Sequence, residues 1–177
     1  MSSPTLLGLC GALRRGSYNR KLMLEAAKIH GGPFTDANLR LPLYDGDIEA
    51  NGVPSEVQVL SDQIAEADGV IIITPEYNKA LSGSLKNALD WVSRTKPNPW
   101  HNKPVVMMSA TSGRSGGERA QTSLRLCLAP FRPLIMNGPE ILVSGATKEF
   151  DENGALISER YLGLISQNMD LLKQAAG

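Results

Sequence analysis

The chain has 177 residues, a typical length for one domain, and its 18 basic and 18 acidic residues cancel. A nucleic-acid-binding protein usually carries an excess of Lys and Arg, and a small electron carrier that docks on basic partners carries an excess of Asp and Glu. The charge balance argues against both classes, so we expect one domain, residues 1–177, with no nucleic-acid partner.

No stretch of the sequence approaches the ~20 consecutive apolar residues that a membrane-spanning helix needs. The first residues, Met-Ser-Ser-Pro, do not resemble the start of a secretory signal peptide. Cys10 and Cys127 lie far apart in the sequence, which favours two reduced thiols, and His30 and His101 lack neighbouring metal ligands. We therefore expect a cytoplasmic protein without a membrane partner or a metal site.

Strand and helix patterns alternate along the chain. In its first half we expect strands at 5–10, 35–39 and 69–74, helices at 18–30 and 55–67, and a long loop at 40–53. Gly31, Gly32 and Pro33 end the first helix, and Ser55 is the expected cap of the second. The unbroken β-branched run at 70–73 is typical of a strand covered on both faces, and thus of a parallel sheet.

In the second half we expect helices at 84–94, 118–131 and 158–175 and strands at 104–110 and 140–143. Five strands alternating with five helices predict a doubly wound α/β sheet with helices on both faces. Ligands bind such sheets beyond the carboxyl ends of the strands. The loops at 11–19, 75–83 and 109–117 follow the first, third and fourth predicted strands, so we expect them to form one site.

The first of these loops has the composition of an anion-binding site. The helix after it offers free N–H groups and a partial positive charge, and Ser17 and Asn19 add neutral donors. Arg14 or Arg15 adds a forked cation suited to phosphate oxygens. The glycine spacing does not fit the dinucleotide fingerprint, the P-loop lysine is absent, and a cysteine phosphatase would need an arginine where Gly16 stands. A single terminal phosphate, as in FMN, remains; the alternative is a plain turn with a capped helix.

The second loop can present backbone groups and an aromatic face to a flat heterocycle. Pro75 fixes the backbone, Tyr77 offers a ring face, and Asn78 can pair with a ring nitrogen or oxygen. The glycines of the third loop, at 111–117, would let its backbone approach a ligand closely. An ordinary turn and a flexible loop are the alternative interpretations of these two segments.

Three segments resemble signatures of the NAD(P)H-dependent FMN reductases. GALRRGSYN at 11–19 is similar to that family's GSxRxxSxN phosphate loop, and GGERAQ at 116–121 to its GGxRAQ segment. TPEYN at 74–78, followed by GSLKNALDW at 83–91, is similar to its TPEYN…PGxLKNAxDW signature. Within the family the chain resembles the bacterial chromate and quinone reductases. The resemblance implies a flavodoxin-like, doubly wound, five-stranded parallel sheet of order 2-1-3-4-5 with helices on both faces.

The resemblance also implies which residues would hold FMN. Arg14, Ser17 and Asn19, with the backbone around Tyr18, would bind its phosphate. The residues that would line the flavin ring or lie against it are Pro75, Glu76, Tyr77, Asn78, Ser109, Ser112 and Gly113. The cofactor supplies the chemistry in such enzymes, so we expect no catalytic residue in the chain itself, with Tyr77 and Asn78 beside the ring.

Two positions depart from the family pattern. Ala12 replaces a serine of the phosphate loop, so the resemblance predicts one hydroxyl donor fewer and weaker flavin binding. Ser82 replaces the proline that commonly precedes Gly83, which predicts a looser loop beside the ring.

The resemblance implies hydride transfer from NADPH or NADH through bound FMN to quinones, chromate or similar acceptors, in ping-pong order. Release of reduced FMN to other enzymes and a flavodoxin-like electron carrier are the alternatives. The family also implies a homodimer or homotetramer. Trp91 and Trp100 either lie at such an interface or pack within the chain.

Overall fold

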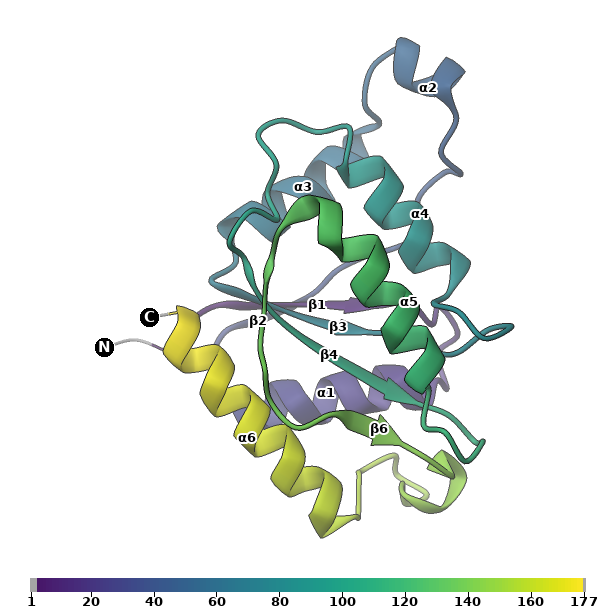
Figure 1. Ribbon diagram of the computed structural model, residues 1–177, viewed down its shortest axis with the longest axis vertical. Coiled ribbons are helices and arrows are strands. Elements are labelled where there is room, and N and C mark those ends of the chain that lie inside the picture. Colours follow the sequence, from purple (N-terminus) through teal and green to yellow (C-terminus); the bar gives the residue numbers. More distant parts are fainter. Residues whose placement is uncertain (1–2, 177) are drawn as a thin grey trace.

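The computed structural model describes residues 3–176, which build one parallel sheet flanked by helices (Figure 1). The strands are β1 (Leu6–Cys10), β2 (Phe34–Asp36), β3 (Gly69–Ile73), β4 (Pro104–Ala110), β5 (Leu134–Ile135) and β6 (Ile141–Val143). All of their pairings are parallel, and the order β2-β1-β3-β4-β5 confirms the predicted flavodoxin-like order.

The fifth position of the sheet is divided between two short strands. β5 pairs with the first two residues of β4, and β6 pairs with its last three. Gly138 and Pro139 lie between them, and a proline has no N–H group to donate to a strand ladder. The predicted strand at 140–143 corresponds to β6, whereas β5 was not predicted.

The helices cover both faces of the sheet (Figure 1). They are α1 (Tyr18–His30), α2 (Gly46–Ala50), α3 (Ser55–Glu66), α4 (Gly83–Val92), α5 (Glu118–Leu128) and α6 (Glu159–Ala176). Alternate residues of β1 enter different cores: Leu6 packs on the side of α1 and α6, and Leu7 and Leu9 pack on the side of α3, α4 and α5. Because both faces are covered, the central strands are apolar apart from Ser109 near the end of β4.

The ends of the helices show which serines act as caps. α1 has the predicted bounds; the Ser17 hydroxyl accepts a hydrogen bond from the Asn19 N–H, and Gly31 adopts φ 68° after the last turn. The prediction of Ser55 as a cap is wrong, because the N-cap of α3 is Pro54 and Ser55 is already helical. Ser82 instead caps α4, its hydroxyl accepting from the Leu85 N–H.

Two helical segments differ from the sequence prediction. α2 lies within the predicted loop at 40–53, begins after the Asp45 cap and stands out from the body of the molecule (Figure 1). The predicted helix at 118–131 is α5 followed by a short 3₁₀ helix, Ala129–Phe131, because Pro130 cannot continue the α-helical hydrogen bonds.

Trp91 and Trp100 are both fully buried, so of the two alternatives the packing within the chain is the one observed. The Trp91 indole N–H donates to the Pro42 carbonyl at 2.8 Å, which ties α4 to the segment before α2. Within residues 3–176, none of the helices combines the length and apolar character needed to cross a membrane.

Candidate functional site

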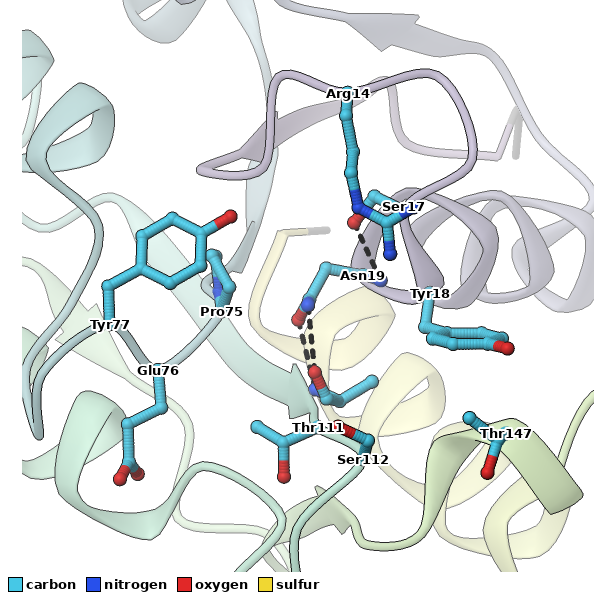
Figure 2. A pocket seen from close by; sticks show the side chains of 11 residues that line it. Arg14, Ser17, Tyr18, Asn19, Pro75, Glu76, Tyr77, Thr111, Ser112 and Thr147 are labelled. Carbon is cyan, nitrogen blue, oxygen red and sulfur yellow. Dashed lines mark hydrogen bonds between the residues drawn. The ribbon is translucent and has the colours of Figure 1, made fainter.

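A cavity of about 390 Å³ lies at the carboxyl ends of β1, β3 and β4, where the three predicted loops meet (Figure 2). Its lining residues are Arg14, Ser17, Tyr18, Asn19, Pro75, Glu76, Tyr77, Ala110, Thr111, Ser112 and Thr147. Eight of the predicted site residues are therefore brought together, and Asn78, Ser109 and Gly113 do not line the cavity. Its volume is in the range of ordinary cofactor sites.

One end of the cavity has the character of an anion site. It faces the N-terminus of α1, whose first turn carries no acidic residue, and Ser17 caps that helix. The Ser17 oxygen accepts from the Asn19 N–H at 3.2 Å, so its own hydrogen remains available to a ligand. The Arg14 guanidinium donates one bond to the Gly16 carbonyl at 2.9 Å and keeps its other N–H groups for an anion.

Arg40 supports this loop from outside the cavity. Its guanidinium donates to the Leu13 carbonyl at 2.8 Å, across 27 positions of sequence. Arg40 lies in the segment predicted as a long loop, and nothing in its sequence neighbourhood indicates the contact.

The opposite end of the cavity is formed by the second loop. Tyr77 and Ala80 exchange two backbone hydrogen bonds, at 3.0 and 3.1 Å, around a tight turn. Asn78 and Lys79 occupy the centre of this turn with φ 50° and 68°, a conformation that asparagine tolerates well. The turn places Asn78 at its exposed tip, whereas Pro75, Glu76 and Tyr77 line the cavity.

Glu76 lines the cavity between Pro75 and Tyr77. Its Oε2 is buried and has no hydrogen-bond partner among residues 3–176. Because protein atoms cover this oxygen, it does not face the cavity, and Glu76 lines the cavity through its other atoms.

Hydroxyl groups join the two ends of the second loop and tie it to the first loop. The Thr74 hydroxyl accepts from the Ser82 N–H at 3.2 Å, and the Ser84 hydroxyl donates to the Gly11 carbonyl at 2.8 Å. Ser82 is buried and caps α4. Ser82 thus makes two hydrogen bonds that a proline could not make, one through its N–H group and one through its hydroxyl, and the looser loop expected from sequence stays a prediction.

The third loop contributes Thr111 and Ser112 to the cavity. Ser109 is buried beneath the loop: its hydroxyl donates to the Gly116 carbonyl at 2.6 Å and accepts from the Gln121 side chain at 2.9 Å. Gly117, with φ 93°, has no space for a side chain, because a Cβ there would lie 2.7 Å from Ser109. Ser109 thus fixes the backbone of the third loop and does not line the cavity itself.

The segment after β6 supplies a lining residue that sequence reasoning missed. Thr147 belongs to the 3₁₀ helix Ala146–Lys148 and lies across the cavity from Tyr77 (Figure 2). The segment is held against the third loop, since the Gly145 N–H donates to the Gly113 carbonyl at 3.0 Å and the Ala146 N–H to the Thr111 carbonyl at 2.9 Å. The rule that ligands bind at the carboxyl ends of strands, applied to the last strand as well, would have found it.

Ala12 is buried and lines a separate polar pocket with Cys10, Arg20 and Arg40. Ala12 does not line the main cavity, and the weaker flavin binding expected from the missing hydroxyl stays a prediction. Burial raises the pKa of the Cys10 thiol, whose Sγ donates to the Ala12 carbonyl at 3.6 Å. Cys10 is thus a neutral, buried thiol and not a nucleophile of the site.

The donor set fits a flavin mononucleotide. A helix N-terminus, a serine hydroxyl and a guanidinium converge at one end, as a terminal phosphate requires. Pro75, Glu76 and Tyr77 lie at the other end, where a flat aromatic ring can pack against the proline and tyrosine side chains. The hydroxyl groups of the serine and threonine residues that line the cavity between its two ends can form hydrogen bonds with a polyhydroxyl chain.

Comparisons with known proteins agree with this geometry. Residues 4–148 match the family model described as NADPH-dependent FMN reductase. The chain is 38% identical over 171 residues to an NAD(P)H-dependent FMN reductase of Pseudomonas aeruginosa, covering 95% of this chain and 92% of that one. It is 40% identical over 139 residues to a quinone reductase of Escherichia coli, covering 76% of this chain and 74% of the other.

A solved structure gives the same result. FerB of Paracoccus denitrificans, described as a flavoenzyme NAD(P)H:(acceptor) oxidoreductase, superposes with a TM-score of 0.86 at 30% identity, over 97% of this chain and 98% of that one. The matched family model, the sequence relatives and the geometry of the cavity agree: the chain belongs to the NADPH-dependent FMN reductase family.

Proposed function

We propose that this protein is an FMN-dependent NAD(P)H oxidoreductase that reduces quinones. The observation that carries the proposal is the cavity of Figure 2, in which an anion-binding helix terminus and an aromatic loop face each other in a chain of this family. Relatives that are quinone reductases, and a Burkholderia relative that reduces 2-hydroxy-1,4-benzoquinone, support this choice of acceptor. Chromate is a further proposed acceptor, because a wide, open cavity selects weakly among small oxidants.

In this proposal each end of the cavity has its own task. Arg14, Ser17 and the N–H groups at the start of α1 bind the phosphate. Pro75, Glu76 and Tyr77 orient the ring, and Ser112 and Thr147 close the cavity on the side of the third loop. Tyr77 is half exposed, so its side chain also contacts whatever molecule enters from solvent.

Bound FMN would supply the redox chemistry, which is hydride acceptance from NADPH or NADH and electron transfer to the acceptor. The task of the chain is to hold the ring with one side open and to stabilise its charge through backbone N–H groups of the second and third loops. Because the same open side would admit reductant and acceptor in turn, we expect ping-pong kinetics.

We also propose that the protein is a homodimer or a homotetramer. The support is the segment around α2, which stands out from the body (Figure 1) and exposes Leu43 and Ile48. Exposed apolar side chains on a projecting segment are typical of a surface that a second subunit covers.

The proposed function is tested with the purified protein, FMN and NADPH. We expect flavin absorbance to survive desalting, and NADPH consumption to rise when a quinone is added. Flavin that is lost on desalting, with free FMN reduced at substrate concentrations, would instead support the release of reduced FMN. Bound flavin without NADPH consumption would support an electron carrier and overturn the proposal.

A further inference from the structure

The side chain of Asn19 joins two distant parts of the site. Its Nδ2 donates to the Ala110 carbonyl at 2.8 Å, and its Oδ1 accepts from the Ala110 N–H at 2.9 Å, although the two residues are 91 positions apart. Figure 2 shows both bonds crossing the floor of the cavity. Asn19 is 4% exposed, so water does not compete for these bonds.

The position of Ala110 explains why the bonds are needed. The pairing of β3 with β4 stops at Ile73 and Met108, so the N–H and C=O of Ala110 extend beyond the last strand partner on that side. Asn19 supplies both a donor and an acceptor there and so completes the ladder with a side chain. Without it, two buried backbone groups would lose their partners.

These bonds connect the two halves of the cavity. Asn19 is the second residue of α1, directly after the turn that carries Arg14 and Ser17. Ala110 is the last residue of β4, directly before the third loop. The Asn19 side chain therefore sets how far the third loop lies from the anion end.

Resting on the proposed function, we infer that Asn19 is a positioning residue that holds the third loop against α1, and not a ligand of the FMN phosphate. A side chain that turned toward a phosphate would leave the N–H and C=O of Ala110 buried and unpaired. The role differs from the phosphate contact that the sequence resemblance implies for Asn19. It predicts that Asn19 affects the binding of flavins with and without a phosphate.

The test compares FMN with riboflavin, which has the same ring but no phosphate. Dissociation constants are measured by fluorescence quenching for the wild type and for Asn19→Ala, Arg14→Ala and Asn168→Ala, with visible circular dichroism of each complex. Asn168 is the matched control: it is another buried asparagine that bonds backbone carbonyls, those of Pro139 and Leu164, away from the cavity.

We expect Asn19→Ala to weaken the binding of FMN and the binding of riboflavin by a similar factor, about tenfold. The variant should also change the circular dichroism of the bound ring. Arg14→Ala should weaken FMN binding by about tenfold or more and leave the dissociation constant of riboflavin unchanged. Asn168→Ala should lower stability without changing either affinity. If Asn19→Ala weakened FMN alone and left riboflavin and the dichroism unchanged, the inference would be overturned; a wild type that binds neither flavin would instead overturn the proposed function.

Hydrogen exchange at the Ala110 amide tests the same inference without a variant. The bond to Asn19 should protect this amide in the free protein and equally in the FMN complex. Faster exchange on FMN binding would show that Asn19 turns to the phosphate, and would contradict the inference even if Asn19→Ala failed to fold.

Discussion

Ser55 and Ser82, at the starts of two helices, have different roles because their backbone positions differ by one residue relative to the helix. Ser82 precedes α4, has an extended backbone and directs its hydroxyl at the Leu85 N–H. Ser55 is the first residue of α3 itself, and its hydroxyl donates to the neighbouring Glu56 carboxylate. An N-cap residue lies directly before the first helical residue and has a non-helical backbone. A serine one position further along the chain is already helical, so its hydroxyl cannot cap the helix.

This difference predicts the stability of two matched variants. Ser82→Ala should lower the free energy of unfolding by about 1 kcal/mol, because the N–H of Leu85 loses its acceptor. Ser55→Ala should change it by less than about 0.5 kcal/mol, since only an exposed contact is lost. Urea unfolding of both variants checks the prediction, and equal losses would contradict it.

At the scale of elements, α1 is anchored at both ends. Its first turn forms the anion end of the site, and its last residue, His30, is buried against the N-terminal segment. The His30 Nε2 bonds the Pro4 carbonyl at 2.8 Å, while its Nδ1 is buried without a partner in the chain between residues 3 and 176. Burial lowers the pKa of His30, the bond to Pro4 opposes this, and the charge of Lys173 on α6 lowers it further.

The lowered pKa of His30 predicts a pH dependence of stability. The unfolded chain, with an ordinary histidine pKa of about 6.5, binds a proton more readily than the folded protein. Stability should therefore be full above pH 7 and should fall as the pH drops through 6.5 toward the lower pKa of the folded state.

Urea unfolding at pH 7.5 and 5.5 measures this effect. Wild type should lose more stability between the two pH values than His30→Gln, whose side chain does not titrate. An equal loss in both proteins would show that His30 does not contribute, and that other groups cause the pH dependence.

At the scale of the whole molecule, the segment before and within α2 is held by hydrogen bonds and exposes an apolar side chain to solvent. Asn87 of α4 accepts from the Tyr44 N–H and donates to the Pro42 carbonyl, both at 2.8 Å. The Tyr44 hydroxyl donates to Glu49 at 2.7 Å. Leu43, between these anchors, is 80% exposed. A fixed backbone that presents an apolar side chain suits a contact between subunits, because little conformational entropy is lost on association.

We therefore expect Leu43→Glu to convert the proposed oligomer into a smaller species, by burying a charge at the contact. Leu126→Glu is the matched control, since Leu126 is 72% exposed on α5 and the proposal assigns it no contact. Size-exclusion chromatography with light scattering gives the mass of each. A monomeric wild type, or equal dissociation of both variants, would contradict the proposal.

Much of this architecture is predictable from sequence because its signals are local. The apolar run of β3, the periodicity of α1 and the glycine after it act within a few residues, and both elements lie where the sequence predicts. β5 has two residues, too few for any periodicity, and exists only because β4 offers it a partner. The segment before the short α2 is bonded to α4 through Pro42 and Tyr44, and the sequence pattern of α2 does not distinguish it from a loop.

The sequence by itself determined the alternation of strands and helices, the edge of the sheet at which the loops meet, and the family signatures along those loops. Only the tertiary structure decided which polar side chains of the loops face the cavity. It turned Asn19 and Ser109 inward to bond backbone groups, placed Asn78 at the tip of a turn, and added Thr147 from the far end of the chain. The physical reason is that composition sets where donors occur along the chain, whereas the direction of each donor depends on unpaired backbone groups that packing brings beside it.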